Sequence, residues 1–140
     1  MKAMAREHYG LEINEGPFGI DSRPALILDK YAEAQGKGAQ FHDEVFRAYW
    51  QQAKSIEDGS VLKEIMTQVG LDSTHYEAAI QNPEHAAAVD ADIAQAHAYG
   101  LNGVPALIFN NKYLVSGAQP YEVLKQVMTK VLEEGRETAQ

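Results

Sequence analysis

The stretch that decides the fold is Gly100–Pro120, which reads GLNGVPALIFNNKYLVSGAQP. Its run Ala106–Phe109 is apolar throughout, which suits a strand that is buried on both faces. Asn110 and Asn111 predict a turn, because asparagine tolerates the left-handed backbone conformation that tight hairpins require. A second β-prone run follows at Tyr113–Val115. The stretch therefore predicts a strand, a hairpin turn and a second strand.

Both ends of this stretch carry helix signals. Gly100 is a predicted helix stop, with Leu101 folding back on the last turn as in a Schellman motif. Gly117 can adopt a positive φ, and Pro120 fits the first turn of a closing helix that we expect to end at about Glu134, before Gly135. The order is thus helix, proline-led strand, hairpin, strand, helix.

The chain before this stretch has the apolar periodicity of helices. The predicted N-caps are Ser22, Asp58, Asn82 and either Asp72 or Ser73. The predicted helices cover residues 2–9, 22–35, 39–53, 59–69, 73–81 and 83–99.

The predicted centre of the helical core is the aromatic segment 39–53. Phe46, Tyr49 and Trp50 of this segment could instead line a ligand pocket, but their helical spacing favours core packing. Residues expected on its apolar face are Phe41, Val45, Ala48 and Tyr49, broadened by Phe46, Trp50 and Ala53.

Composition limits the possible functions. The 140 residues are 45% apolar, which is enough for one domain with a core. Twelve basic and 20 acidic residues give a formal net charge of −8, so we expect neither nucleic acid nor an anionic membrane as a partner. No apolar run approaches the roughly 18 residues of a membrane span, and the first eight residues lack the apolar region of a signal peptide. The expected location is the cytoplasm.

The sequence assigns no catalytic residue and no metal ligand. It contains no cysteine, which excludes disulfides, thiolate metal sites and a cysteine nucleophile from this chain. The five histidines form no i, i+4 pair, so solvated helix surface is their favoured interpretation. Neither a Gly-x-Ser-x-Gly elbow nor a phosphate loop is present, and nothing indicates a bound cofactor.

One bond stands out, Val104–Pro105. A proline that opens a buried strand is unusual, because it forfeits a ladder hydrogen bond. Two interpretations stay open: a cis bond, which exposes the backbone of the preceding residue to a partner, or a trans proline at the first residue of an edge strand.

These residues carry a family resemblance. Gly103–Ala106 and Tyr113–Pro120 resemble the C-terminal part of the DsbA-like thioredoxin-fold proteins, with the FrnE-type dithiol–disulfide isomerases as the nearest branch. The segments Gln35–Lys37, Val45–Trp50 and Val69–Asp72 resemble the helical insertion of that family. The resemblance covers roughly residues 8–134.

The resemblance implies an α/β, mostly helical fold: a partial thioredoxin-like fold with a large all-helical insertion. Pro105 would be the cis-proline of that fold, and Gly103, Val104 and Pro105 would bind an extended peptide or thiol substrate. We expect a single domain made of four parts: residues 1–21, the helical insertion 22–99, the thioredoxin-like strands and helix 100–134, and a tail 135–140.

The departure from the family is as informative. Family members open with a strand, a Cys-x-x-Cys at a helix start and a second strand, and the chain shows none of this. We expect that this unit is missing, through natural truncation, a misassigned reading frame or an expressed fragment. Thiol–disulfide exchange needs a thiolate, so the implied oxidoreductase or isomerase would be inactive alone.

Two alternative functions stay open beside this one. The first is a non-catalytic binding or remnant protein. The second is a protein like the glutathione-dependent 2-hydroxychromene-2-carboxylate isomerases. Those isomerases typically carry Gln-Asp-Arg where this chain has Ala118-Gln119-Pro120, so the FrnE-type assignment is favoured.

A bare strand edge would follow from the missing unit. An apolar, unpaired edge at Ala106–Asn110 favours association, and a lone hairpin is marginal in water. We expect a homodimer through this edge, giving a four-stranded sheet across a two-fold axis. Alternatively, Glu12–Phe18 could lie across the edge.

Overall fold

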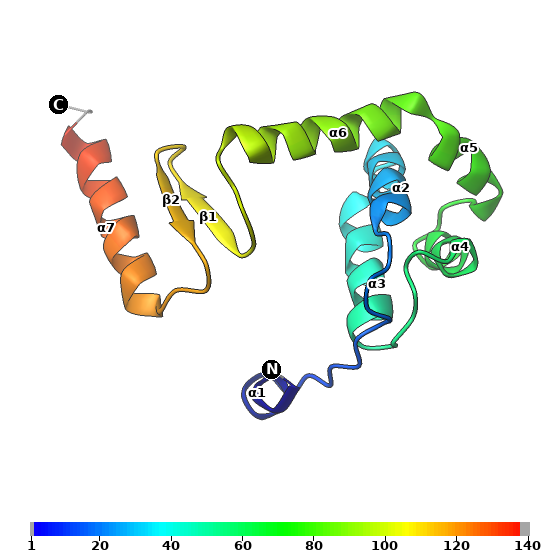
Figure 1. The fold of residues 1–140 in the computed structure, drawn as a ribbon, viewed down its shortest axis with the longest axis horizontal. Coiled ribbons are helices and arrows are strands. Elements are labelled where there is room, and N and C mark those ends of the chain that lie inside the picture. Colours follow the sequence, from blue (N-terminus) through cyan, green and yellow to red (C-terminus); the bar gives the residue numbers. More distant parts are fainter. Residues whose placement is uncertain (1, 138–140) are drawn as a thin grey trace. The chain divides into compact units, whose positions relative to one another are not determined.

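The fold is mostly helical with one two-stranded sheet, as expected (Figure 1). The computed structural model describes residues 2–137. Over those residues the elements are α1 (Lys2–Tyr9), α2 (Arg23–Ala34), α3 (Gly38–Trp50), α4 (Gly59–Gln68), the 3-10 helix η1 (Ser73–His75), α5 (Tyr76–Gln81), α6 (Pro83–Ala98), β1 (Ala106–Phe109), β2 (Tyr113–Ser116) and α7 (Tyr121–Glu137).

The chain divides into two compact units. The first unit ends at Asp92 and the second begins at Ile93, so the division falls within α6. The four-part, single-domain organisation expected from the sequence stays a prediction.

Three of the predicted N-caps are confirmed. The carboxylates of Asp58 and Asp72 accept the backbone N–H groups two residues on, at 2.8 and 2.9 Å, and the Asn82 side chain does the same at 2.9 Å. Ser22 is the N-cap residue of α2, as predicted, but its backbone is helical at φ −83° and ψ −5° and its side chain makes no capping hydrogen bond. Asp21 Oδ1 accepts the Arg23 N–H at 2.9 Å instead.

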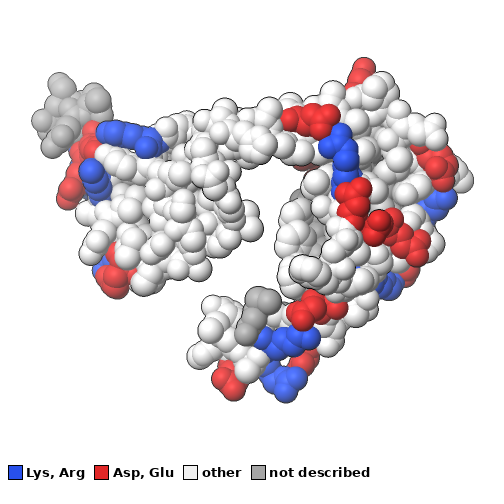
Figure 2. Space-filling model, viewed as in Figure 1, with Lys and Arg blue, Asp and Glu red and all other residues white. Residues whose placement is uncertain are grey.

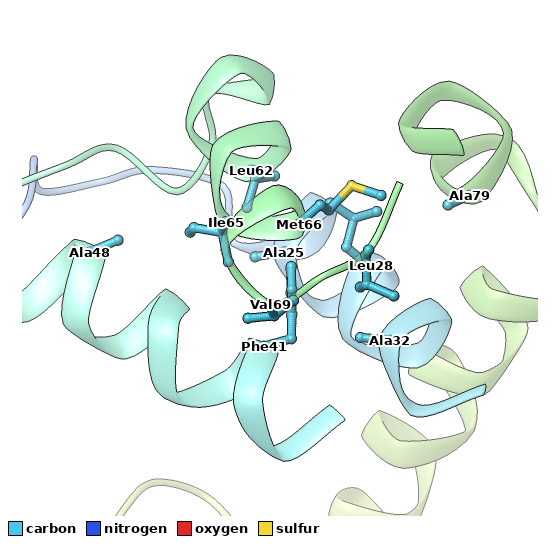
Figure 3. Packing of buried hydrophobic residues seen from close by; sticks show 11 residues of the cluster. Ala25, Leu28, Ala32, Phe41, Ala48, Leu62, Ile65, Met66, Val69 and Ala79 are labelled. Carbon is cyan, nitrogen blue, oxygen red and sulfur yellow. The ribbon is translucent and has the colours of Figure 1, made fainter. Parts of the chain in front are cut away.

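The core of the first unit lies where α2, α3, α4 and α5 meet. Phe41 of α3 is fully buried and points toward Val69 and the side chains of α2 and α4 (Figure 3). The buried cluster consists of Ala25, Leu28, Ala32, Phe41, Ala48, Leu62, Ile65, Met66, Val69, Leu71 and Ala79.

The prediction that Phe46 and Trp50 belong to this core is wrong. Their exposed fractions are 52% and 37%. On a helix with 100° per residue, they lie about 140° and 180° around the axis from Phe41. Because α3 turns its Phe41–Ala48 stripe toward α2 and α4, these two aromatic side chains stay on its outer side.

Ion pairs join α2 to α6 within the first unit. The Arg23 guanidinium lies 2.8 Å from the Asp90 carboxylate. Lys30 Nζ lies 2.8 Å from the Asp92 carboxylate and 3.1 Å from that of Glu33. Basic and acidic side chains accordingly lie side by side where these helices meet (Figure 2). The pairs are exposed, so each contributes little to stability.

The segment Glu12–Phe18, which we call the strap, runs along the end of α3. The N–H groups of Asn14 and Gly16 donate to the carbonyls of Trp50 and Tyr49 at 2.7 Å each, and the Asn14 carbonyl accepts the Ala53 N–H at 3.0 Å. These backbone bonds satisfy carbonyls that the helix end leaves open. The strap therefore pairs with the C-terminal end of α3.

The second unit contains the predicted hairpin. β1 and β2 pair antiparallel, with Ala106 opposite Ser116 and Phe109 opposite Tyr113. Asn110 and Asn111 both have a φ of 53°, and the Lys112 N–H donates to the Phe109 carbonyl at 3.0 Å, which confirms the predicted turn.

The predicted helix stop at Gly135 is wrong. α7 continues through this glycine to Glu137. A glycine on an exposed helix costs only about 1 kcal/mol, and Gly135 is not among the glycines with positive φ that would form a left-handed cap. The rest of the predicted tail, 138–140, lies outside the described residues.

Apolar side chains of the second unit are only partly covered. Among its described residues none is buried, and Leu107, Ile108, Leu114, Met128 and Leu132 are exposed. Over the strands the view in Figure 2 is largely free of charge, and charged side chains gather along α7. A hairpin of this size needs further apolar contacts for independent stability.

Gly16 in the strap should resist substitution. A Cβ built there would lie 2.5 Å from the Lys54 carbonyl oxygen and 2.6 Å from Tyr49 Cδ2. We expect Gly16→Ala to lower the free energy of unfolding by roughly 1–3 kcal/mol, because it overpacks a tight contact. Urea unfolding followed by Trp50 fluorescence measures this. Glu15→Ala in the same strap should change stability by less than about 0.5 kcal/mol; equal effects of the two variants would contradict the prediction.

Candidate functional site

The candidate site is the loop Gly103–Pro105, which connects α6 to β1. α6 ends as predicted, since the N–H groups of Gly100 and Leu101 donate to the carbonyls of His97 and Ala96 at 2.9 and 3.1 Å, with Gly100 at φ 70°. This is the Schellman arrangement, which reverses the chain at the helix end. The reversal brings Gly103, Val104 and Pro105 to the head of β1.

All three loop residues are exposed, and Val104 is 94% exposed. The Val104–Pro105 peptide bond is cis. The Pro105 carbonyl accepts the Gly117 N–H at 2.8 Å, which fixes the loop to the end of β2. Among the described residues, the backbone groups of Gly103 and Val104 have no hydrogen-bond partner. The loop therefore presents unpaired donors and acceptors beside a strand.

The same region offers an unpaired strand edge. In an antiparallel pair, residues with their backbone bonds directed to the partner alternate with residues whose N–H and C=O point away. The hydrogen bond from the Gly117 N–H to the Pro105 carbonyl fixes this alternation. The backbone N–H and C=O groups of Leu107 and Phe109 therefore point toward β2. Ala106 and Ile108 consequently direct their backbone groups to the other edge of β1.

The far end of the hairpin is tied to α7. The Tyr113 hydroxyl donates to the Glu134 carboxylate, and Lys112 Nζ lies 2.9 Å from the same carboxylate. Lys130 Nζ lies 4.7 Å from the centre of the Tyr113 ring. The hydrogen bond from Tyr113, followed by that from Lys112, lowers the pKa of Glu134. These contacts hold α7 against the turn and so orient β1.

The arrangement offers unpaired backbone groups with which an extended chain could pair, but it supplies no thiol, because the sequence has no cysteine. Within the described residues no group of three or more His, Asp or Glu side chains could hold a metal ion. No helix of that part of the chain combines the length and apolar character needed to cross a bilayer.

Two features of the first unit were not found from the sequence. His85 is partly buried and its Nδ1 lies 3.1 Å from the Ala79 carbonyl oxygen, so it is not simply solvated surface. Asp29 lines a cavity between α2 and α3 with a buried carboxylate oxygen. The sequence signal that could have revealed Asp29 is its position four residues after Ala25, which places a carboxylate on the apolar face of α2.

The chain belongs to the DsbA-like thioredoxin domain family, whose model matches residues 2–129. The structure and the sequence motifs agree with this class of protein, and the expected family is confirmed. Among curated proteins no match was found.

The chain is also similar to two solved structures. The probable DsbA oxidoreductase of Streptomyces coelicolor is 28% identical with a TM-score of 0.77, over 95% of this chain and 58% of the other. A 2-hydroxychromene-2-carboxylate isomerase is 18% identical with a TM-score of 0.74, over 96% and 66% of the two chains. The chain thus spans less than two thirds of either relative, and at 18% identity the second shows the fold alone.

The contact between Tyr113 and Glu134 should be visible in a pH titration. Because the folded-state pKa of Glu134 is lowered, its stabilisation is present above the unfolded pKa of about 4.3 and is lost as the pH falls through the folded pKa. We expect Tyr113→Phe to raise the pKa of Glu134, measured by carbon NMR of its carboxyl group. The control Tyr121→Phe changes an exposed tyrosine of α7, the helix that carries Glu134, and should leave the pKa of Glu134 unchanged. If Tyr113→Phe also left that pKa unchanged, the hydrogen bond from Tyr113 to Glu134 would be contradicted.

Proposed function

We propose that the chain is the substrate-binding part of a FrnE-type thiol–disulfide oxidoreductase or isomerase of the cytoplasm. In this proposal the redox cysteines are supplied from outside this sequence. The observation that carries it is the exposed residue Val104 at the head of β1, whose backbone groups have no hydrogen-bond partner among the described residues. Membership of the DsbA-like family supports it.

The chemistry divides between the two parts. Exchange requires a thiolate that attacks a disulfide sulfur in line with the leaving sulfur. The loop Gly103–Pro105 would hold an extended peptide or thiol substrate through the N–H and C=O of Val104, so that its sulfur faces the cysteine pair. By itself the chain binds the substrate and cannot exchange disulfides.

An isomerase of the 2-hydroxychromene-2-carboxylate type is the weaker alternative. The solved isomerase shares the fold at 18% identity, which carries no information on chemistry. Ala118-Gln119-Pro120 departs from the Gln-Asp-Arg typical of those enzymes. A purely binding or remnant protein is the other alternative. Reading the DNA upstream of Met1 distinguishes it from the oxidoreductase, because only the oxidoreductase requires an encoded Cys-x-x-Cys there.

Peptide binding tests the role of the loop. We expect an extended peptide with an S-methylated cysteine to shift the amide signals of Gly103 and Val104 in NMR spectra. Val104→Pro removes the backbone donor and should weaken binding about tenfold, whereas Val104→Ala keeps the donor and should bind as the wild type does. Equal binding by both variants would count against pairing with the Val104 backbone.

An insulin-reduction assay accompanies this titration. The chain alone should show no reduction above the rate of the buffer, since it offers no thiol. Measurable activity would overturn the division of the chemistry between two parts.

We further propose that, in the isolated chain, the Ala106–Asn110 edge pairs with the same edge of a second copy. The supporting observation is that Ala106 and Ile108 direct their backbone groups away from β2, as argued above. Exposed Leu107 and Ile108 add apolar area to such an interface. An unpaired, apolar edge of this kind favours strand addition.

Ile108→Pro tests this pairing. The substitution removes an N–H that points away from β2, so it should leave the hairpin intact while converting a dimer to a monomer. Ile108→Thr keeps the donor and the β-branched shape and should stay dimeric. Light scattering on micromolar samples gives the mass of each variant. A compact wild-type monomer at these concentrations would refute the proposal.

A further inference from the structure

A small apolar cavity lies between α2 and α3 in the first unit, within the described residues. Its volume is about 160 Å³. Two phenylalanines line it: Phe41, which is fully buried, and Phe46, which is half-exposed. Leu26, Val45 and Ile56 add aliphatic walls. An apolar cavity of roughly 150 Å³ accommodates one benzene ring, so this one has the size of a single ring or a short alkyl chain.

One carboxylate interrupts the apolar wall. Asp29 lines the cavity, and its Oδ1 is buried without a hydrogen-bond partner among the described residues. Burial, and then the neighbouring Glu33, raise the pKa of Asp29, whereas His42 and Lys30 lower it. A buried polar oxygen without a partner is costly, so a ligand that brings a donor to the Asp29 carboxylate relieves part of that cost.

Among the described residues, no lysine or arginine forms an ion pair with Asp29. Lys30, the nearest lysine in sequence, is already held by Glu33 and Asp92 at 3.1 and 2.8 Å. The ring of His42 stacks on Phe46, with 4.6 Å between the ring centres, so it widens the aromatic rim. Aromatic faces attract cations, and a net charge of −8 draws them to the protein.

We propose that this cavity binds a small primary amine, with its ammonium group on the Asp29 carboxylate and its apolar body against Phe46, Val45 and Leu26. The binding is non-covalent and separate from the loop Gly103–Pro105. It does not depend on the proposed redox function, because every residue involved belongs to the first unit.

Benzylamine and benzyl alcohol are matched probes for this site, since they share the ring and differ in charge. We expect benzylamine to bind about tenfold more tightly, equivalent to ~1.4 kcal/mol, in titrations followed by amide NMR signals of α2 and α3. Asp29→Asn should abolish the preference for the amine while the weak binding of the alcohol persists. Glu57→Gln removes the same charge from an exposed residue outside the cavity and should keep the preference.

Three results would overturn the proposal. They are equal affinity for the two probes in the wild type, an unchanged preference in Asp29→Asn, and signal changes confined to residues outside α2 and α3. The comparison of benzylamine with benzyl alcohol on the wild-type protein tests the proposal even if a variant fails to fold. Val104→Pro, which tests the loop, should bind benzylamine normally, so failure of the redox proposal and failure of this one are distinguishable.

Discussion

The packing of Phe41 against α2 and α4 is the contact on which the first unit depends. Around this ring the buried side chains of four helices form one cluster, and that cluster is closed within residues 25–79. Burying a phenylalanine side chain contributes about 1.5–3 kcal/mol, more than an exposed ion pair such as Arg23–Asp90 contributes. The N-caps and the strap then fix where each helix starts and ends around the cluster.

The second unit, unlike the first, has no buried cluster among its described residues. Its hairpin is specified by local backbone preferences, yet none of its described side chains is buried. The contacts of Glu134 with Lys112 and Tyr113 hold α7 at one end of the hairpin, while the β1 edge and the Gly103–Pro105 loop stay open at the other. An incomplete apolar layer beside unpaired backbone groups is the physical basis for both proposed partners of this unit, the substrate and the second copy.

Local signals were predicted well from the sequence, and tertiary choices were not. Asn110 and Asn111 encode their turn whatever surrounds them, and Gly100 encodes a helix end in the same way. Segment 39–53 is aromatic on more than one side, so periodicity could not tell which side α2 and α4 would cover, and Trp50 was misplaced. Whether Asp29 finds a partner depends on neighbours far along the chain, which no local pattern records.

The closed cluster in the first unit bears on how such proteins diversify. The buried side chains of this cluster all come from residues 25–79. Substitutions on the outer faces of these helices, including the rim of the amine-sized cavity, can therefore accumulate while the buried cluster is kept. Natural selection can thus vary what these helices bind without altering the side chains that hold them together.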